Sequence, residues 1–140
     1  MTLKSGRSFS NDSVARKNFG PFTPGFISIP YDDIDALEKA LKQENVAGFL
    51  VEPIQGEAGV YVPSEGYLSK AKKICEQYDV LFIADEVQTG IARTGRLLAT
   101  CGNCNCSDKS CSEIPDVKPD ILILGKAISG GVYPVSAVLT

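Results

Sequence analysis

Two charged residues, Asp85 and Lys126, each follow directly after a run of apolar residues. Asp85 comes after residues 80–84, and Lys126 comes after residues 121–125. Both runs are typical of buried strands, and in open α/β sheets a ligand lies just outside the carboxyl ends of the strands. The sequence therefore predicts that an aspartate and a lysine meet at one edge of a sheet.

A lysine in this setting has two interpretations. It can be an ordinary surface lysine that carries its ammonium group into water. It can instead be a lysine that desolvation leaves as a free amine, which attacks an aldehyde. Pyridoxal 5′-phosphate requires such an amine, together with a carboxylate at its pyridinium nitrogen. Lys126 and Asp85 supply that pair and suggest this cofactor.

An aspartate at a strand end also has other interpretations. It can cap a helix or form a structural ion pair, because an unpaired buried charge is costly. An Asp-Glu pair after an apolar strand also resembles the magnesium-binding strand of P-loop nucleotide hydrolases. Those enzymes need a G-x-x-x-x-G-K-[ST] loop. Here Lys126 is followed by Ala127 and position 120 is an aspartate, so the sequence disfavours nucleotide hydrolysis.

Four cysteines stand close together, at Cys101, Cys104, Cys106 and Cys111. Their C-x₂-C pair could bind zinc as part of a Cys₄ site. The remaining C-x-C and C-x₄-C spacings do not match a zinc ribbon, so we favour four thiols that bind no metal. Disulfides are disfavoured in a reducing compartment. The fifth cysteine, Cys75, lies on the apolar face of a predicted helix and is expected in the core.

The composition excludes several classes of partner. The 140 residues fit one domain, with 44% apolar and 22% charged residues and a formal net charge of −3. Without a run of Lys or Arg, this charge disfavours nucleic acid and anionic membranes. No apolar run reaches the ~18–20 residues that cross a bilayer, and no secretory signal is visible. We expect a cytoplasmic protein, with the mitochondrial matrix as the alternative for a longer form. Histidine is absent, so proton transfer must use Lys, Asp, Glu, Tyr or Cys.

Apolar runs alternate with segments of helical period, which predicts an α/β fold with a mostly parallel sheet flanked by helices. The first helix is expected to run from its N-cap Asp32 to about Gln43, and the second from Ser64 to about Asp79. The predicted strands cover residues 26–30, 47–51, 80–84, 121–124 and 134–139.

Four motifs occur in a fixed order along the chain: VEPIQGEAG (51–59), LFIADEVQTG (81–90), RTG (93–95) and LGKAISGG (124–131). Together they resemble the class III aminotransferases, which depend on pyridoxal 5′-phosphate. Within that class, the wording of residues 18–22, 56–59 and 131–137 is similar to the ornithine type. The resemblance covers roughly residues 18–100 and 117–140.

The resemblance implies the central part of the large domain of a fold-type I transferase, spanning residues 1–140 as one partial domain. It implies that the δ-amino group of ornithine passes to a 2-oxo acid, giving glutamate semialdehyde and an amino acid, in a homodimeric enzyme. The acetylornithine and 4-aminobutyrate types are alternatives within the class. A non-catalytic fragment that serves in dimerisation or metal binding is an alternative from another class.

The resemblance also implies roles for the residues that would contact the cofactor. Lys126 would bind the cofactor aldehyde and move a proton between the substrate and the cofactor. Asp85 would bind the pyridinium nitrogen. Val87 would pack on one face of the ring, and Gln88 would donate a hydrogen bond to its phenolic oxygen.

Two further residues would bind the substrate, and the chain departs from the family near one of them. Glu57 matches a glutamate that gates the substrate pocket by pairing with a distal arginine. Arg7 resembles the arginine that binds the substrate carboxylate, although the interval between it and Phe19 is short. Lys4 stands where the family has an aromatic ring, and residues 101–116 form a cysteine-rich insertion.

Overall fold

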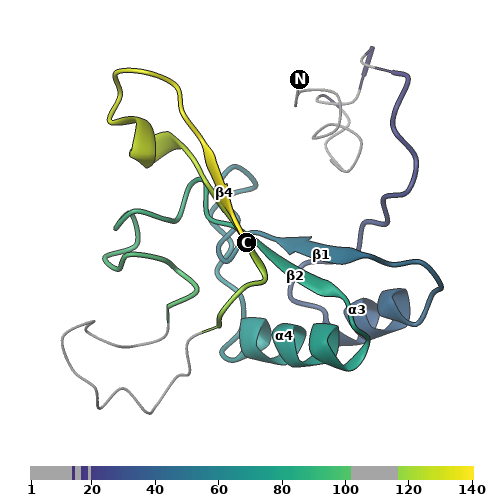
Figure 1. The fold of residues 1–140 in the computed structure, drawn as a ribbon. Coiled ribbons are helices and arrows are strands. Elements are labelled where there is room, and N and C mark those ends of the chain that lie inside the picture. The colour runs from purple at the N-terminus through teal and green to yellow at the C-terminus, as the bar shows by residue number, and fades with distance from the viewer. Residues whose placement is uncertain (1–13, 15–16, 19, 102–116) are drawn as a thin grey trace, which may run out of the picture.

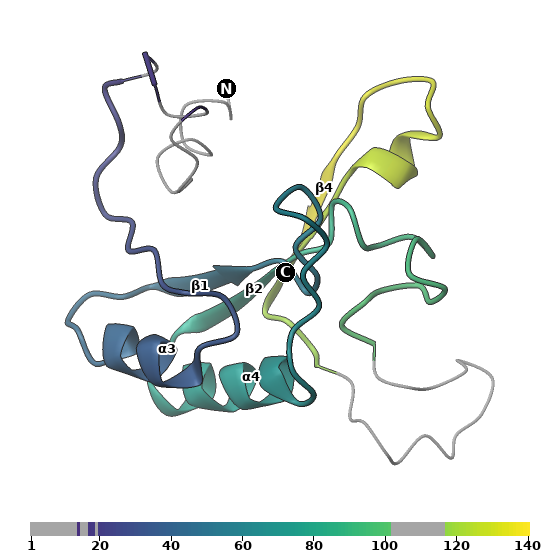
Figure 2. The same ribbon diagram turned by 180° about the vertical axis from the view of Figure 1, so that it is seen from behind.

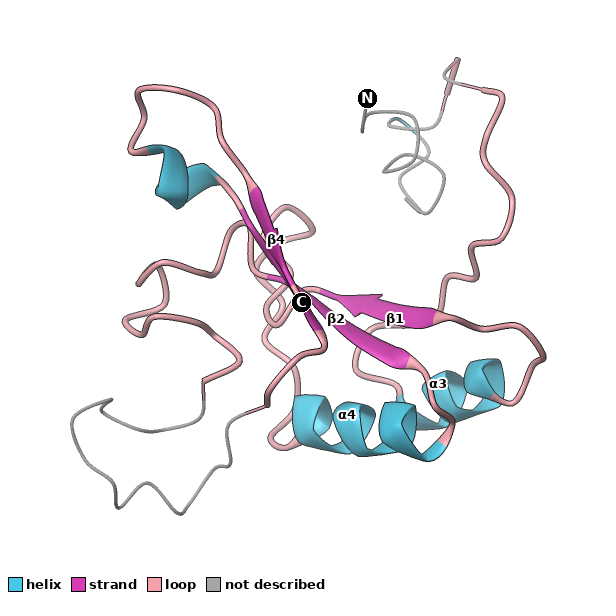
Figure 3. Cartoon of the chain, viewed as in Figure 1, coloured by secondary structure: helices cyan, strands magenta, loops and turns pink. Residues whose placement is uncertain are grey.

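The computed structural model describes residues 14, 17–18, 20–101 and 117–140. Within these residues the chain forms a four-stranded sheet with the strand order β1-β2-β3-β4 (Figure 1; Figure 3). The elements in chain order are α3 (Ile34–Leu41), β1 (Gly48–Val51), α4 (Tyr67–Gln77), β2 (Leu81–Asp85), β3 (Ile121–Leu124), the 3₁₀ helix η1 (Lys126–Ser129) and β4 (Ala137–Leu139).

The sheet is mostly parallel, as the alternation of strands and helices predicted. β1 pairs with β2, and β2 with β3, in parallel, whereas β4 returns antiparallel to β3. The predicted strand at 121–124 is confirmed, and β2 runs one residue beyond its predicted end, to Asp85. The strand predicted at 26–30 is wrong, because those residues form no strand with any part of the chain that the structure describes.

The core lies between the sheet and the two helices, which cover the same face of it (Figure 1; Figure 2). Alternate residues of the strands point toward α3 and α4, among them Phe82 and Ala84, which are fully buried. Cys75 is also fully buried on α4, as predicted. The opposite face of the sheet is also apolar, but there Leu50 is 38% exposed and Val138 is 65% exposed.

The predicted start of the first helix is wrong by one residue. Asp33 is the N-cap of α3, and its side chain accepts a hydrogen bond from the Ala36 backbone N–H at 2.8 Å. Asp32 adopts a left-handed φ of 63°. Its carboxylate accepts hydrogen bonds from the Ser64 N–H at 2.9 Å and the Ser64 hydroxyl at 2.8 Å. Asp32 thus joins the segments that precede both helices, and α4 begins only at Tyr67.

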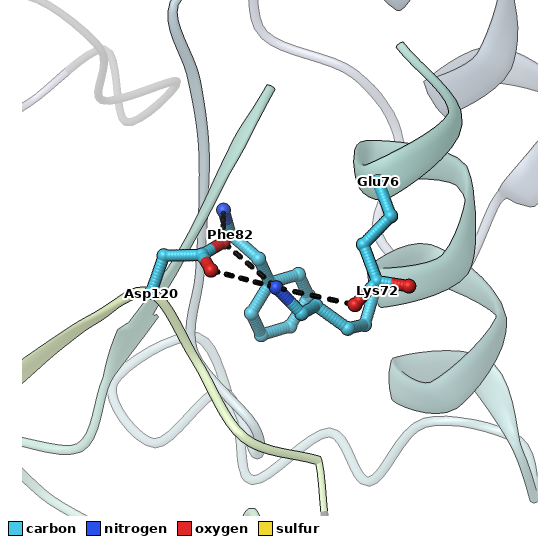
Figure 4. Close-up of polar contacts among 4 residues, drawn as sticks. All are labelled: Lys72, Glu76, Phe82 and Asp120. Carbon is cyan, nitrogen blue, oxygen red and sulfur yellow. Dashed lines mark hydrogen bonds and ion pairs between the residues drawn. The ribbon is translucent and has the colours of Figure 1, made fainter. Parts of the chain in front are cut away.

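Asp120 connects three elements at the start of β3 (Figure 4). Its carboxylate accepts hydrogen bonds from the Lys72 ammonium at 2.8 and 2.9 Å and from the Phe82 backbone N–H at 2.7 Å. Lys72 also lies 3.5 Å from a carboxylate oxygen of Glu76. Burial acts to raise the pKa of Asp120, but the ammonium of Lys72 and the N–H of Phe82 outweigh it, so the pKa lies below its usual value.

We expect Asp120→Asn to remove part of the stability that depends on this carboxylate. The folded pKa is below the unfolded value of about 3.9, so the contribution is present above about pH 4 and is lost as the pH falls through the folded pKa. At pH 7 the variant should lose about 1–2 kcal/mol of unfolding free energy, because a charged hydrogen-bond acceptor becomes a neutral amide. Urea unfolding at pH 7 and at pH 3 measures both values.

Glu76→Gln is the matched control, because Glu76 contacts the same lysine at 3.5 Å and its side chain is 60% exposed. Its effect at pH 7 should be smaller than that of Asp120→Asn. Equal losses of stability between pH 7 and pH 3 in wild-type protein and Asp120→Asn would show that the carboxylate makes no contribution.

Candidate active site

Because β1, β2 and β3 are parallel, the segments that follow them emerge at the same edge of the sheet. Three predicted site residues meet there. The side-chain amide of Gln88 donates a hydrogen bond to Glu57 Oε1 at 3.1 Å. The Nζ atom of Lys126 lies 3.5 Å from the same oxygen. One carboxylate from the β1 loop therefore contacts residues that follow β2 and β3.

Asp85 is the last residue of β2 and is half-buried at this edge. It pairs with Ile123 of β3, three positions before Lys126. Its Oδ1 atom accepts a hydrogen bond from the Val87 backbone N–H at 3.0 Å. Asp85 has no ion pair within the part of the chain that the structure describes. The contacts therefore do not support the interpretation of Asp85 as a structural ion pair.

Lys126 is the first residue of η1 and has a left-handed φ of 43°. This conformation is unfavourable for a residue with a side chain, and such outliers concentrate at functional sites. The side chain is 54% exposed, so its amine is accessible to a small molecule. The backbone conformation thus agrees with a chemical role for this lysine.

Close backbone packing holds the residues after β2 against their neighbours. A Cβ atom added to Gly125 would lie 3.0 Å from a methyl carbon of Val87, and one added to Gly56 would lie 3.0 Å from the amide group of Gln88. A Cβ atom at Gly90 would lie 2.8 Å from the backbone oxygen of Glu86. Glycine at these three positions lets the segments that follow the strands approach one another closely.

The loop that carries Glu57 is fixed at both of its ends. The Tyr31 hydroxyl group contacts the backbone oxygens of Glu52 and Pro53, each at 3.0 Å. Burial raises the pKa of Tyr31, so the hydroxyl remains a donor at neutral pH. Farther on, Gln55 and Tyr61 exchange backbone hydrogen bonds of 3.0 and 2.9 Å. Glu57 lies in the turn that this bridge closes.

Some predicted residues lie outside the described part of the chain. These are the substrate-binding candidate Arg7, Lys4, and three cysteines of the insertion, Cys104, Cys106 and Cys111. Within residues 14, 17–18, 20–101 and 117–140, no cluster of three or more His, Cys, Asp or Glu side chains could bind a metal ion.

The donor set at this edge fits an aldehyde-bearing pyridine ring. Lys126 supplies an accessible amine, and Asp85 supplies a carboxylate that can hold a protonated ring nitrogen. The amide of Gln88 can donate to a ring oxygen, and Val87 offers an apolar surface. A separate open cavity of about 290 Å³, beside the start of α4, is lined by none of these four side chains.

Glu86 received no separate role from the sequence, although it follows Asp85 directly. It is only 1% exposed, and its carboxylate accepts hydrogen bonds from Thr89, Ala99 and Thr100. Its position inside a buried segment was the signal available in the sequence, because a buried glutamate requires partners. The partners at 99 and 100 are distant in sequence and could not be identified from spacing.

Comparisons with known proteins show which family the chain is similar to. The family model described as aminotransferase class-III matches residues 5–140. The mitochondrial ornithine aminotransferase of Drosophila melanogaster is 59% identical over 132 residues, which cover 94% of this chain and 28% of that protein. The chain thus spans less than a third of the length of this relative.

Solved structures give the same result for the fold. The ornithine aminotransferase from Toxoplasma gondii ME49 matches with a TM-score of 0.84 and 53% identity, over 97% of this chain and 30% of that one. An acetylornithine aminotransferase from Elizabethkingia anophelis is 63% identical but has a TM-score of 0.71, over 84% of this chain and 28% of that one. The Toxoplasma protein therefore matches more of the chain and its fold, although its sequence identity is lower.

We expect Gly90→Ala to destabilise the protein and disturb the turn after β2. The added methyl group would lie 2.8 Å from the Glu86 backbone oxygen and 2.9 Å from a methyl carbon of Leu124. Such overpacking lowers the unfolding free energy by about 1–3 kcal/mol, which urea unfolding measures. Gly20→Ala is the control, since a Cβ atom there meets no described residue within 4 Å. Equal stability of the two variants would contradict the close packing at Gly90.

Proposed function

Because this chain belongs to the class III aminotransferase family, we propose that it forms part of a pyridoxal 5′-phosphate-dependent ornithine aminotransferase. Such an enzyme transfers the δ-amino group of ornithine to a 2-oxo acid and yields glutamate semialdehyde and an amino acid. The observation that carries the proposal is the meeting of Lys126, Gln88 and Glu57 at the edge of the sheet where Asp85 ends β2.

The cofactor, when bound, supplies an electron-withdrawing pyridinium ring that stabilises negative charge on the substrate carbon. Lys126 provides the amine that holds the cofactor through its aldehyde. The same amine, when free, would act as the base that moves a proton between the substrate carbon and the cofactor. Its side chain is 54% exposed, so the amine is accessible to a substrate and a cofactor.

Asp85 and its neighbours orient the ring in this proposal. The carboxylate of Asp85 holds the proton on the ring nitrogen, because a nearby negative charge favours the charged form of that nitrogen. The hydrogen bond from the Val87 N–H fixes the orientation of the carboxylate. Val87 would pack on the ring, and Gln88 would donate to its phenolic oxygen.

Glu57 and Arg7 are the proposed substrate-binding residues. Glu57 places a carboxylate 3.5 Å from the Lys126 amine, beside the point where the substrate amino group must react. Its 84% exposed side chain is free to change partners and so to gate the pocket. Arg7 offers a guanidinium group, which binds a substrate carboxylate in bidentate geometry.

The proposed partners are a small amino acid, a 2-oxo acid and a second copy of the chain in a homodimer. We propose a location in the cytoplasm or the mitochondrial matrix. The second is supported by the relative from Drosophila melanogaster, which is named as mitochondrial. Among the described residues, none of the helices is both long and apolar enough to cross a membrane. An acetylornithine aminotransferase is the second candidate, supported by the identity to the protein from Elizabethkingia anophelis.

Reduction with borohydride in the presence of pyridoxal 5′-phosphate tests the cofactor site. Mass spectrometry should find one adduct on Lys126, because the reduced bond between the amine and the cofactor is permanent. Lys126→Ala should abolish it, whereas Lys70→Ala, on the exposed side of α4, should leave it unchanged. Asp85→Asn should weaken cofactor binding about 10- to 100-fold through loss of a charged hydrogen bond. Adducts scattered over many lysines would overturn the proposal.

Assays with ornithine, acetylornithine and 4-aminobutyrate separate the candidate substrates. We expect the highest kcat/KM with ornithine. Glu57→Gln should raise the KM for ornithine on the order of tenfold, because a charged partner of the substrate pocket becomes neutral. The Lys126 adduct should persist in this variant. A preference for acetylornithine would favour the second candidate, and an unchanged KM in Glu57→Gln would remove Glu57 from the substrate site.

A further inference from the structure

Glu86 is a carboxylate buried at the end of β2, and within the described segments it has no cationic partner. Four hydrogen bonds converge on its two oxygens. Oε1 accepts from the Thr100 N–H at 2.8 Å and the Thr100 hydroxyl at 2.9 Å. Oε2 accepts from the Ala99 N–H at 3.0 Å and from the Thr89 hydroxyl. The carboxylate thus ties residues 99 and 100 to the end of the strand.

The backbone of Glu86 is held as firmly as its side chain. Its N–H donates to the Ile123 oxygen of β3 at 2.9 Å, and its oxygen accepts from the Gly90 N–H at 2.8 Å. The residue is therefore attached to β3, to its own turn and to the segment at 99–100.

This constraint acts on the residues beside Glu86. Asp85 precedes it, and Val87 and Gln88 follow it, so all three depend on the orientation of the same peptide groups. The hydrogen bond between Asp85 and Val87 spans Glu86 directly. Any rotation of the Glu86 backbone would therefore move the Asp85 carboxylate and would turn the Gln88 amide away from Glu57.

We infer that Glu86 is a positioning residue, which holds Asp85, Val87 and Gln88 in the orientation that the ring of the cofactor requires. The inference rests on the proposed function, and Glu86 itself contacts neither the cofactor nor the substrate. It acts through the turn at 86–90 and through its anchor at Thr100. If Glu86 had a purely structural role, its substitution would lower stability in the same way but would leave the orientation of a bound ring unchanged.

Glu86→Gln is the sharpest variant, because it keeps the size of the side chain. The amide group replaces one acceptor oxygen by an NH₂ donor, so at least one of the four donors must face another donor. Thr89→Val removes one of the four hydrogen bonds with little change in shape, and Thr89→Ser retains the hydroxyl. Asp120→Asn is the control for stability alone, since it loosens the Phe82 end of β2, away from the site.

The experiment titrates pyridoxal 5′-phosphate into the purified protein and follows the visible absorption and circular dichroism of the Lys126-bound cofactor. In Glu86→Gln we expect the borohydride adduct on Lys126 to persist at saturating cofactor. The dissociation constant should rise about 10- to 100-fold, since small misplacements of positioned groups have effects of this size. The circular dichroism band should change, because it reports the orientation of the ring. Thr89→Val should change the dissociation constant and the band in the same direction but by less, and Thr89→Ser should resemble wild type.

Three results would overturn the inference. An unchanged affinity and circular dichroism band in Glu86→Gln would do so while leaving the proposed function intact. So would an equal loss of affinity in Asp120→Asn, because stability alone would then explain it. Absence of a Lys126 adduct in wild-type protein would overturn the proposed function as well. If Glu86→Gln does not fold, the comparison of Thr89→Val with Thr89→Ser decides the question in the same way.

Discussion

The parallel pairing of β1, β2 and β3 is the constraint on which the rest of the structure depends. It places Val51 opposite Ala84 and Asp85 opposite Ile123, so the segments that follow all three strands emerge together. Side chains alternate between the faces of a sheet, and a shift of the pairing by one residue would move Asp85 to the opposite face. The candidate site thus depends first on the strand register and only then on the individual residues.

Two carboxylates reinforce this register. Asp120 binds the N–H of Phe82 near the start of β2, and Glu86 binds residues 99 and 100 at its end. The two carboxylates differ in their partners. Asp120 pairs with a lysine, whereas Glu86 relies on neutral donors. Both connect β2 to segments that are distant in the sequence.

Much of this arrangement was predictable from the sequence because it follows from local patterns. The strand at 121–124, the burial of Cys75 and the placement of Asp85 and Lys126 at strand ends all reflect periodicity or adjacency. The N-cap could not be assigned correctly, because Asp32 and Asp33 are equally good caps and the contact of Asp32 with Ser64 is a tertiary one.

Long-range contacts explain the remaining differences from the sequence-based predictions. Two of the partners of Glu86, Ala99 and Thr100, lie 13 and 14 residues farther along a loop without periodicity. The meeting of Glu57 and Lys126 joins residues 69 positions apart. Neither contact can be predicted from the order of the residues. The resemblance to a family assigned roles to Glu57 and Lys126 but none to Glu86.

The left-handed backbone of Lys126 has a consequence for how this chain tolerates change. Val60, Ile91 and Ala92 share that conformation, and all of them lie in loops that follow the ends of β1 and β2. Glycine would relieve the strain at Lys126, where a side chain costs roughly 1–2 kcal/mol, and would remove the amine that we propose holds the cofactor. Selection for stability alone would therefore act against function at this position. In the core that the helices cover, stability and fold do not conflict, because substitutions that preserve packing also preserve the fold.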